Sequence, residues 1–385
     1  MIYIKKEGFL KGGAVMRNVV FLCFLVITFL AAGSALSQER LPLGLPPVPI
    51  PEDNPQTKEK IALGKKLYED KRFSADGTVS CATCHDSAKA FGDGLPVAEG
   101  INKLKGTRNS PTVINAAYYT SQFWDGRRPS LEEQAKDPFL NPVEHGLGKE
   151  QNFHQFIIDI IRKDPDYPKA FRQVFGVDKK GITIDHVVKA IASFERTVIS
   201  GNSPFDRYKY GGDQNALSES AKRGLGLYLG KARCQECHMI SEKYALFTDN
   251  KFHNLGVGFN KIRPKLRKLV KEVKMSQKKG KAMDESILTK SDVSELGRFV
   301  ITGKTSELGA FKTPTLRNIA VTGPYMHDGS MATLEEVMEL YNKGGEKNPF
   351  LGSVRVLNLT DQEIKDIIAF LESLTSPEFA DLDKK

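Results

Sequence analysis

Two short motifs carry four of the five cysteines in this chain. They are Cys81-Ala-Thr-Cys84-His85 and Cys234-Gln-Glu-Cys237-His238. Cys-x-x-Cys-His is the spacing of a c-type haem attachment site, in which both thiols bond to the haem and the adjacent histidine binds its iron. Two copies in one chain predict two covalently bound haems. A zinc site or a structural pair of cysteines is the alternative use of such spacing.

The first 37 residues have the order of a secretory signal peptide, with basic residues before an apolar run and small residues after it. The basic residues are Lys5, Lys6, Lys11 and Arg17, the run covers residues 19–32, and Gly33, Ser34 and Ala35 follow. This run is shorter than the roughly 20 residues that a membrane-spanning helix needs. We therefore predict export to the periplasm with no membrane span left after cleavage, an uncleaved anchor being the alternative. Cys23 lies in the middle of the run, so we do not interpret it as a lipid attachment site.

The composition describes a globular body behind this leader. The chain has 385 residues, of which 40% are hydrophobic and 27% charged, and this is enough for two ordinary domains. Its formal net charge of +9 falls when the leader is removed, because the leader holds four basic residues and one acidic residue. The body is therefore only mildly basic, and we predict no nucleic-acid partner.

A similar segment precedes each haem motif. Thr57 and Ser218 suit the N-cap of a helix, and each helix ends in Leu-Tyr with a glycine, Gly64 or Gly224, three residues before the leucine. Glycine there allows a second helix to come close. Each unit also closes with an amphipathic pattern of helical period. The apolar positions are Ile184, Val187, Val188, Ile191 and Phe194 in the first and Ile364, Ile367, Ile368, Leu371 and Leu374 in the second, with Thr183 and Thr360 as caps.

These elements predict a mostly α-helical chain of two cytochrome c-like domains in tandem, each with one covalent haem. A Pro-rich lead over residues 38–56 is expected to be extended. The first domain covers residues 57–200 and the second residues 201–376. The joint, near residues 200–214, is rich in turn-forming residues.

A basic insertion interrupts the second domain at residues 261–281, with ten Lys or Arg and one Glu. Leu266, Leu269, Val270 and Val273 give part of it a helical stripe. Such a segment is either a solvated insertion or a docking patch for an acidic redox partner.

Several further motifs lie between and after the haem motifs, in a fixed order. They are Phe91-Gly-Asp-Gly94, Thr107-Arg108-Asn109-Ser-Pro111-Thr112, Phe123-Trp124-Asp125-Gly126-Arg127, Leu131-Glu-Glu-Gln134, Asn141-Pro-Val-Glu144, Phe311-Lys-Thr-Pro314-Thr-Leu-Arg317-Asn318 and Pro324-Tyr-Met-His327-Asp-Gly329. With these motifs the chain resembles the bacterial di-haem cytochrome c peroxidases and their MauG-type relatives, over roughly residues 55–375.

The resemblance has consequences for the first haem. Better-known members supply a distal histidine from the loop after the first haem motif, but this chain has no histidine between His85 and Asn109. We expect a five-coordinate first haem, open to peroxide, as in MauG-type members. His145 stands where the family usually has methionine, and it is expected either to tune Glu144 or to reach the iron.

Three residues are candidates for catalysis by resemblance. Glu144 matches the family's catalytic carboxylate, which would move a proton between the two oxygen atoms of peroxide and typically contributes about 10²–10⁴-fold. Gln134 matches a residue of the same pocket. Trp124, the only tryptophan, matches a residue placed between the haems to pass electrons. Without the motif, a buried core position for Trp124 and a surface position for Glu144 would be the simpler interpretations.

The sixth ligand of the second haem separates the subfamilies. Counting from His327, Tyr341 occupies the position of the family's distal methionine, and MauG-type proteins have tyrosine there. A phenolate favours oxidised iron, whereas methionine raises the potential. Met326 and Met338 are the alternative ligands. His327 matches a histidine near the second haem that is not expected to bind iron.

A calcium ion is implied by the resemblance alone, with Asn109, Thr322 and Pro324 as its ligands.

The main functional hypothesis is a periplasmic peroxidase that reduces hydrogen peroxide with electrons from a small cytochrome c or blue copper protein. One alternative is a MauG-type enzyme that uses peroxide to oxidise residues of a partner protein. Another is a non-catalytic di-haem electron carrier. For the assembly, a homodimer and a monomer are the two alternatives.

Overall fold

The computed structural model of the protein describes residues 41–148, 153–280 and 283–382. The predicted signal peptide over residues 1–37, with Cys23, lies outside the described residues. So do residues 38–40 of the Pro-rich lead and Lys281 of the basic insertion. The residues from Pro42 onward form one compact unit.

The described chain is mostly helical, as predicted, with two short strands. The helices are α1 Lys58–Glu69, α2 Cys81–Cys84, α3 Leu131–Leu140, α4 Phe153–Lys163, α5 Tyr167–Phe175, α6 Ile184–Glu195, α7 Pro204–Lys209, α8 Glu219–Leu229, α9 Phe259–Ile262, α10 Leu266–Lys278, α11 Asp284–Thr289, α12 Ser291–Ser294, α13 Phe299–Thr302, α14 Leu334–Asn342 and α15 Asp361–Glu372. The strands are β1 Phe252–His253 and β2 Phe311–Lys312. None of the helices in the described part is long and apolar enough to cross a membrane.

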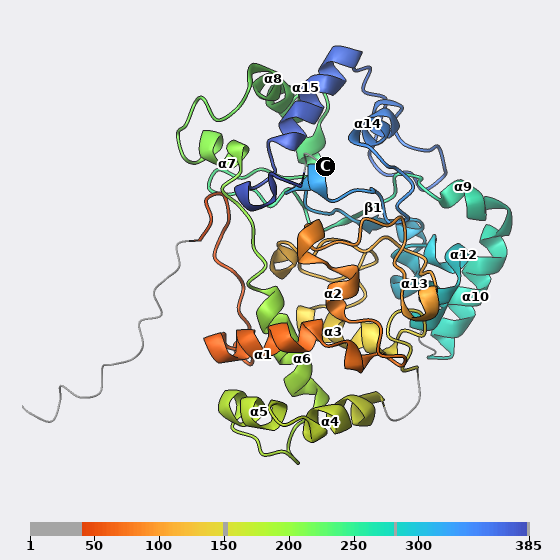
Figure 1. The fold of residues 1–385 in the computed structure, drawn as a ribbon. Helices are drawn as coiled ribbons and strands as arrows, with labels where there is room; N and C mark the ends of the chain where they lie inside the picture. The colour runs from red at the N-terminus through yellow and green to blue at the C-terminus, as the bar shows by residue number, and fades with distance from the viewer. Residues whose placement is uncertain (1–40, 149–152, 281–282, 383–385) are drawn as a thin grey trace, which may run out of the picture. The chain divides into compact units, whose positions relative to one another are not determined.

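The first half is built on the crossing of α1 and α6, which Figure 1 shows below α2. Thr57 caps α1, as predicted, and its side chain accepts from the Lys60 N–H. The helices cross at Gly64, where a Cβ atom would lie 1.9 Å from the carbonyl oxygen of Ala190. Only glycine permits this approach. The apolar stripe of α6 is buried in the core of this half.

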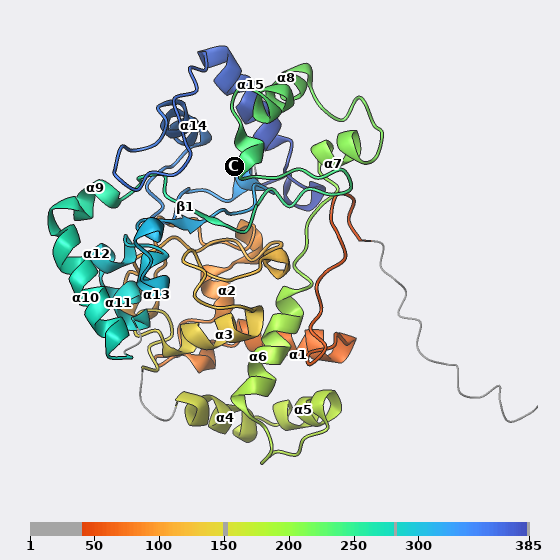
Figure 2. The same cartoon turned by 180° about the vertical axis from the view of Figure 1, so that it is seen from behind.

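The second half repeats this arrangement with α8 and α15, which lie side by side in Figures 1 and 2. Ser218 and Thr360 cap the two helices, as predicted. A Cβ atom on Gly224 would lie 1.9 Å from the carbonyl oxygen of Asp366. Leu374 lies beyond the end of α15 but is fully buried in the core of this half.

A second repeat was not recognised in the sequence. Residues 111–134 align without gaps to residues 314–337, and the two segments share their backbone conformation. Asn115 and Asn318 both have left-handed backbone angles, with φ of 63° and 59°. Each segment then makes the same isolated bridge, between Gln122 and Arg128 and between Tyr325 and Met331. The helix that follows is α3 in the first half and α14 in the second.

Strands β1 and β2 pair antiparallel within the second half. Phe252 pairs with Lys312, and His253 with Phe311. Lys312 also donates its backbone N–H to the carbonyl oxygen of Trp124, at 2.8 Å. A short stretch of sheet from the second half is therefore bonded to the segment of the first half that carries Trp124.

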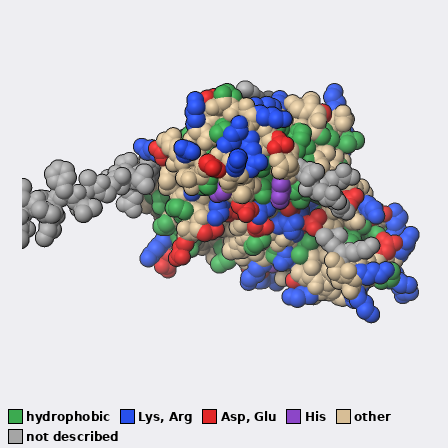
Figure 3. Space-filling view, turned by 90° about the horizontal axis from the view of Figure 1, so that it is seen from below, with side chains coloured by type: hydrophobic (Ala, Val, Ile, Leu, Met, Phe, Trp, Pro, Cys, Tyr) green, Lys and Arg blue, Asp and Glu red, His purple; other side chains and the backbone are tan. Residues whose placement is uncertain are grey.

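The basic insertion is part of a folded layer, α9 to α13, with its own core. Leu269 and Val273, from the predicted stripe, are buried in this core. The layer packs on the first half, where Thr107 donates to the carbonyl oxygen of Ile287 at 2.7 Å and Arg108 donates to Ser294 Oγ at 2.8 Å. The Lys and Arg side chains of α10 are exposed. On the face shown in Figure 3, basic and acidic side chains are interspersed.

The lead and the joint are more structured than the sequence indicated. In the lead, the carbonyl oxygen of Gly44 accepts from Arg317 at 2.7 Å. Arg317 also forms a fully buried ion pair with Asp206, at 2.8 Å. The joint contains the short helix α7, because Ser203 caps it and Pro204 occupies its first turn, where proline is tolerated.

Candidate active site

The first haem motif lies on the wall of a cavity of about 160 Å³. Cys81 and Cys84 are the ends of α2, so both thiols and the following His85 belong to one short turn of chain. Neither thiol forms a disulfide. The cavity is also lined by α3, by the end of α6 and by Leu288 of α11, so the inserted layer closes part of it.

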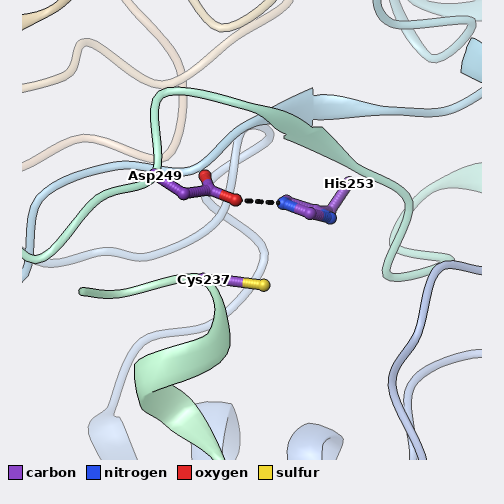
Figure 4. A group of neighbouring side chains, drawn as sticks. All are labelled: Cys237, Asp249 and His253. Carbon is purple, nitrogen blue, oxygen red and sulfur yellow. Dashed lines mark hydrogen bonds and ion pairs between the residues drawn. The ribbon is translucent and has the colours of Figure 1, made fainter.

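The second haem motif lies on the wall of a larger cavity, of about 360 Å³. Cys234, Cys237 and His238 line it, and neither thiol is in a disulfide. Figure 4 shows Cys237 beside the hydrogen-bonded pair Asp249 and His253, whose Oδ2 and Nε2 atoms are 2.8 Å apart. These three side chains could also hold a metal ion. Thioether formation at Cys237 would leave only two of them for such an ion.

Both motif histidines are prepared to bind iron. Burial lowers the pKa of His85 and of His238, which favours the neutral imidazole that a metal requires. The Nδ1 atom of His85 faces the carbonyl oxygen of Phe91 at 3.4 Å, and that of His238 faces Phe247 at 2.9 Å. Donation from Nδ1 to a carbonyl leaves Nε2 as the ligand atom. Free thiol pairs and neutral histidines on two cavity walls are therefore a donor set that fits two c-type haems.

The three residues predicted for catalysis all line the first cavity. Gln134 lies on α3, and Glu144 lies in the turn that follows this helix. Burial raises the pKa of Glu144, while Arg127 and a hydrogen bond from Asn141 act in the opposite direction. A carboxyl group whose pKa is raised takes up a proton more readily than an ordinary glutamate, which suits it to proton transfer.

His145 also lines the first cavity, next to Glu144. Its Nδ1 atom is 3.0 Å from the carbonyl oxygen of Phe73, and its ring packs edge-on against Phe139. Burial lowers the pKa of His145 to about 4, so the ring is neutral at ordinary pH. Its predicted effect on Glu144 or on the iron stays a prediction.

Trp124 lines both cavities, and its indole N–H donates to the carbonyl oxygen of Asn109 at 3.0 Å. Beside it, Asp125 is fully buried and pairs with Arg108 at 2.6 Å and with Arg127 at 3.2 Å. Burial would raise the pKa of Asp125, but the two guanidinium groups lower it to about 2. The sequence motifs did not predict that these three side chains interact, although Asp125 and Arg127 belong to one of the family motifs.

The second cavity contains all three candidates for its distal ligand, Tyr341, Met338 and Met326. Tyr341 and Met338 lie on α14, and burial, with Cys234 close by, raises the pKa of Tyr341. The repeat gives each candidate a counterpart in the first cavity. Extended through α3 and α14, it pairs Pro138 with Tyr341, Ala135 with Met338 and Phe123 with Met326, and all three counterparts line the first cavity. None of these counterparts has an atom that can bind iron.

The residues predicted to hold calcium, Asn109, Thr322 and Pro324, line the second cavity together. Asn109 donates its side-chain amide to the carbonyl oxygen of Leu95 at 2.9 Å, so its Oδ1 atom is the one that could hold a cation. His327 lines the same cavity and pairs with the buried Glu295 at 2.8 Å.

Known proteins resemble this chain over most of its length. A family model described as di-haem cytochrome c peroxidase matches residues 58–215. The methylamine utilization protein MauG of Methylorubrum extorquens is 38% identical over 328 residues, which are 85% of this chain and 81% of that protein. Cytochrome-c peroxidase IdrP1 of Denitromonas iodatirespirans is 39% identical over 356 residues, 90% of each. A solved MauG-like protein associated with microbial copper homeostasis is 33% identical, with a TM-score of 0.71 over 89% of this chain and 98% of that one.

Proposed function

Because this chain belongs to the di-haem cytochrome c peroxidase family, it is an oxidoreductase with two haems, and we propose that it reduces hydrogen peroxide at the first of them. The observation that carries the proposal is the difference between the cavities. The first has a partly buried carboxylate, Glu144, and no side chain with a ligand atom at the positions of Tyr341, Met338 and Met326.

The roles of the first-cavity residues follow from their chemistry. A haem held by Cys81, Cys84 and His85 would supply the iron that exchanges electrons with peroxide. Glu144 accepts a proton from one peroxide oxygen and donates it to the other, because its raised pKa suits both steps. Gln134 offers an amide that can orient the peroxide by hydrogen bonding. Arg127 acts electrostatically on Glu144 and favours its ionised form.

Electrons for this reaction would enter through the second haem. Trp124 lies on the wall that both cavities share, which supports a role in passing electrons between them. A small cytochrome c or blue copper protein is the proposed donor.

The proposed compartment is the periplasm, with residues 1–37 as the export signal, and one calcium ion is proposed at Asn109, Thr322 and Pro324. The monomer and the homodimer are both compatible with these roles.

A second candidate function is favoured by Tyr341. A phenolate ligand would hold the second haem in its oxidised state, and the enzyme could then draw electrons from a partner protein, as MauG-type members do. Met338 or Met326 as ligand would favour the ordinary peroxidase. The identity of this ligand therefore separates the two functions.

Two spectroscopic measurements on the purified oxidised holoprotein test the open first haem and the ligand of the second. Electron paramagnetic resonance should show one high-spin ferric signal, from the open first haem. Only low-spin signals would contradict an open site, unless His145→Ala restored a high-spin signal and so identified His145 as the ligand. The near-infrared spectrum should lack a methionine–iron charge-transfer band. A band that persists in Tyr341→Phe would exclude Tyr341 and favour the ordinary peroxidase.

The role of Trp124 is tested by Trp124→Phe. We expect slower oxidation of the second haem after peroxide is added, with unchanged binding of peroxide at the first, measured by stopped-flow absorbance. Tyr119→Phe is a matched control, because Tyr119 is another aromatic side chain on the shared wall. Equal slowing in the two variants would argue for a general packing effect and against a specific role for Trp124.

A further inference from the structure

Lys312 is a buried lysine at the junction of the two halves. Its side chain and backbone are only 7% exposed. Its backbone N–H donates to the carbonyl oxygen of Trp124, and its Nζ atom donates to the carbonyl oxygen of Ser121 at 2.8 Å. The same Nζ atom lies 3.6 Å from the centre of the Tyr119 ring. Lysine is among the residues most rarely buried without a partner, so this position needs an explanation.

The protein supplies only part of the counter-charge that a buried ammonium group requires. In the described part of the chain, Lys312 forms no ion pair with a carboxylate. Asp125 is the carboxylate that acts on it electrostatically, but Asp125 is already paired with Arg108 and Arg127. Burial lowers the pKa of Lys312 to about 7 against this attraction. A carbonyl oxygen and an aromatic face offset only a fraction of the desolvation of a buried charge.

The position of Lys312 indicates where the missing charge comes from. Lys312 lines both the cavity with Cys81 and Cys84 and the cavity with Cys234 and Cys237. A haem carries two propionate carboxylates, so four carboxylates accompany the two cofactors. A buried carboxylate is stable only when it is paired or hydrogen-bonded. The other two cations of the first cavity, Arg108 and Arg127, are committed to Asp125, which leaves Lys312 as the unpaired cation of the described wall.

We propose that Lys312 is the counter-cation of the haem carboxylates on the wall between the two cavities, and that its charge raises the reduction potential of the haem it faces. A positive charge near a haem destabilises the oxidised form, which has one more positive charge than the reduced form. The effect is large where water is excluded, because the local dielectric constant is low. Lys312 thus acts through the haems and is a positioning residue. The proposal depends on the presence of two haems and not on which reaction they perform.

The test is a potentiometric titration of both haems in the holoprotein, followed by absorbance. Lys312→Gln removes the charge and keeps an amide that can donate to Ser121. We expect the reduction equilibrium of at least one haem to shift at least tenfold toward the oxidised form, which is about 59 mV for a one-electron couple. Lys312→Arg keeps the charge and should stay within about threefold of the parent. Lys251→Gln is the matched control, because Lys251 lines the second cavity but is exposed and screened by solvent.

Two results would overturn the proposal. One is a Lys312→Gln protein in which the reduction equilibria of both haems stay within about threefold of the parent. The other is an equal shift in Lys312→Gln and Lys312→Arg, which would mean that packing and not charge is responsible. If Lys312→Gln does not retain two haems, Lys312→Met replaces it, since methionine fills a similar volume without charge. The same tenfold criterion then applies.

Discussion

The two haem-binding halves share their proximal frame and differ at their distal walls. In each half, a glycine lets two helices cross, and a tyrosine one turn further on donates to the carbonyl oxygen of the motif histidine, Tyr68 to His85 and Tyr228 to His238. Each of these tyrosines also packs against a phenylalanine, with ring centres 5.0 Å apart. This frame holds the two motif histidines in the same way twice.

The distal walls have diverged within the same repeat. Where the second half has Tyr341, the first has Pro138, and where the first has Gln134, the second has Val337. Trp124 likewise corresponds to His327. At these repeat positions the first wall therefore has no ligand side chain, whereas the second has Tyr341, Met338 and Met326. The two cavities therefore differ chiefly by substitutions on α3, α14 and the turns beside them, and on the proposed function these substitutions would give the two haems different roles.

The largest expected effect comes from removing Glu144, the carboxyl group proposed to act at the first haem. Glu144→Gln should lower peroxide turnover by about 10²-fold or more, because the amide cannot relay a proton. Haem content and the thermal melting temperature should stay the same. The control is Glu133→Gln, an exposed carboxylate on α3. Turnover within a few-fold of the parent would remove Glu144 from the mechanism and weaken the assignment of the first haem as the reactive one.

The pH profile sharpens this prediction. Glu144 must be ionised to accept the first proton, and burial raises its pKa above the ordinary glutamate range. Activity should therefore be present above this raised pKa and be lost as the pH falls through it. The parent should lose turnover in this way as the pH falls, and we call this loss the acid limb of the profile. The Glu144→Gln variant should lack it. An acid limb of the same position in both proteins would assign the titration to a different group.

The sequence predicted the parts of both halves that depend on local chemistry. Haem attachment, the caps at Thr57 and Thr360 and the apolar stripe of α6 all follow from short-range patterns. The family motifs named residues that share one cavity, although their roles remain predictions. The buried position of Lys312 could not be predicted, because lysine is usually exposed and its partners Ser121 and Trp124 are far away in the sequence. The folded layer around α10 was missed for a similar reason, since its core combines apolar residues of α10 with those of four short helices.

A smaller effect is expected from filling the two helix crossings, and it tests whether they are equally tight. Gly64→Ala and Gly224→Ala each place a methyl group 1.9 Å from a backbone oxygen, so the helices must move apart. Overpacking of this kind costs about 1–3 kcal/mol, and we expect about 2 kcal/mol of destabilisation in each variant. The measurement is the melting temperature of the holoprotein.

Gly226→Ala is the matched control for these variants. Gly226 lies in α8, and nothing is within 4 Å of its added Cβ atom. Alanine is favoured over glycine inside a helix by about 1 kcal/mol, so this variant should be as stable as the parent or more so. A loss of stability at only one of Gly64 and Gly224 would show that the two frames are not equivalent.

The smallest expected effect concerns the tyrosines that hold the motif histidines. Tyr68→Phe and Tyr228→Phe each delete a hydroxyl that donates to a histidine carbonyl oxygen, and each leaves that oxygen without this bond. Loss of such a hydrogen bond costs about 1 kcal/mol, and more when the acceptor stays buried. Because both rings are almost fully buried, the two variants should lower the melting temperature of the holoprotein by similar amounts. The absorbance bands of the altered half should shift while those of the other half stay in place, since each tyrosine acts on one histidine only. A shift in both sets of bands from a single substitution would mean that the proximal frames are coupled, and the comparison of two independent halves would then fail.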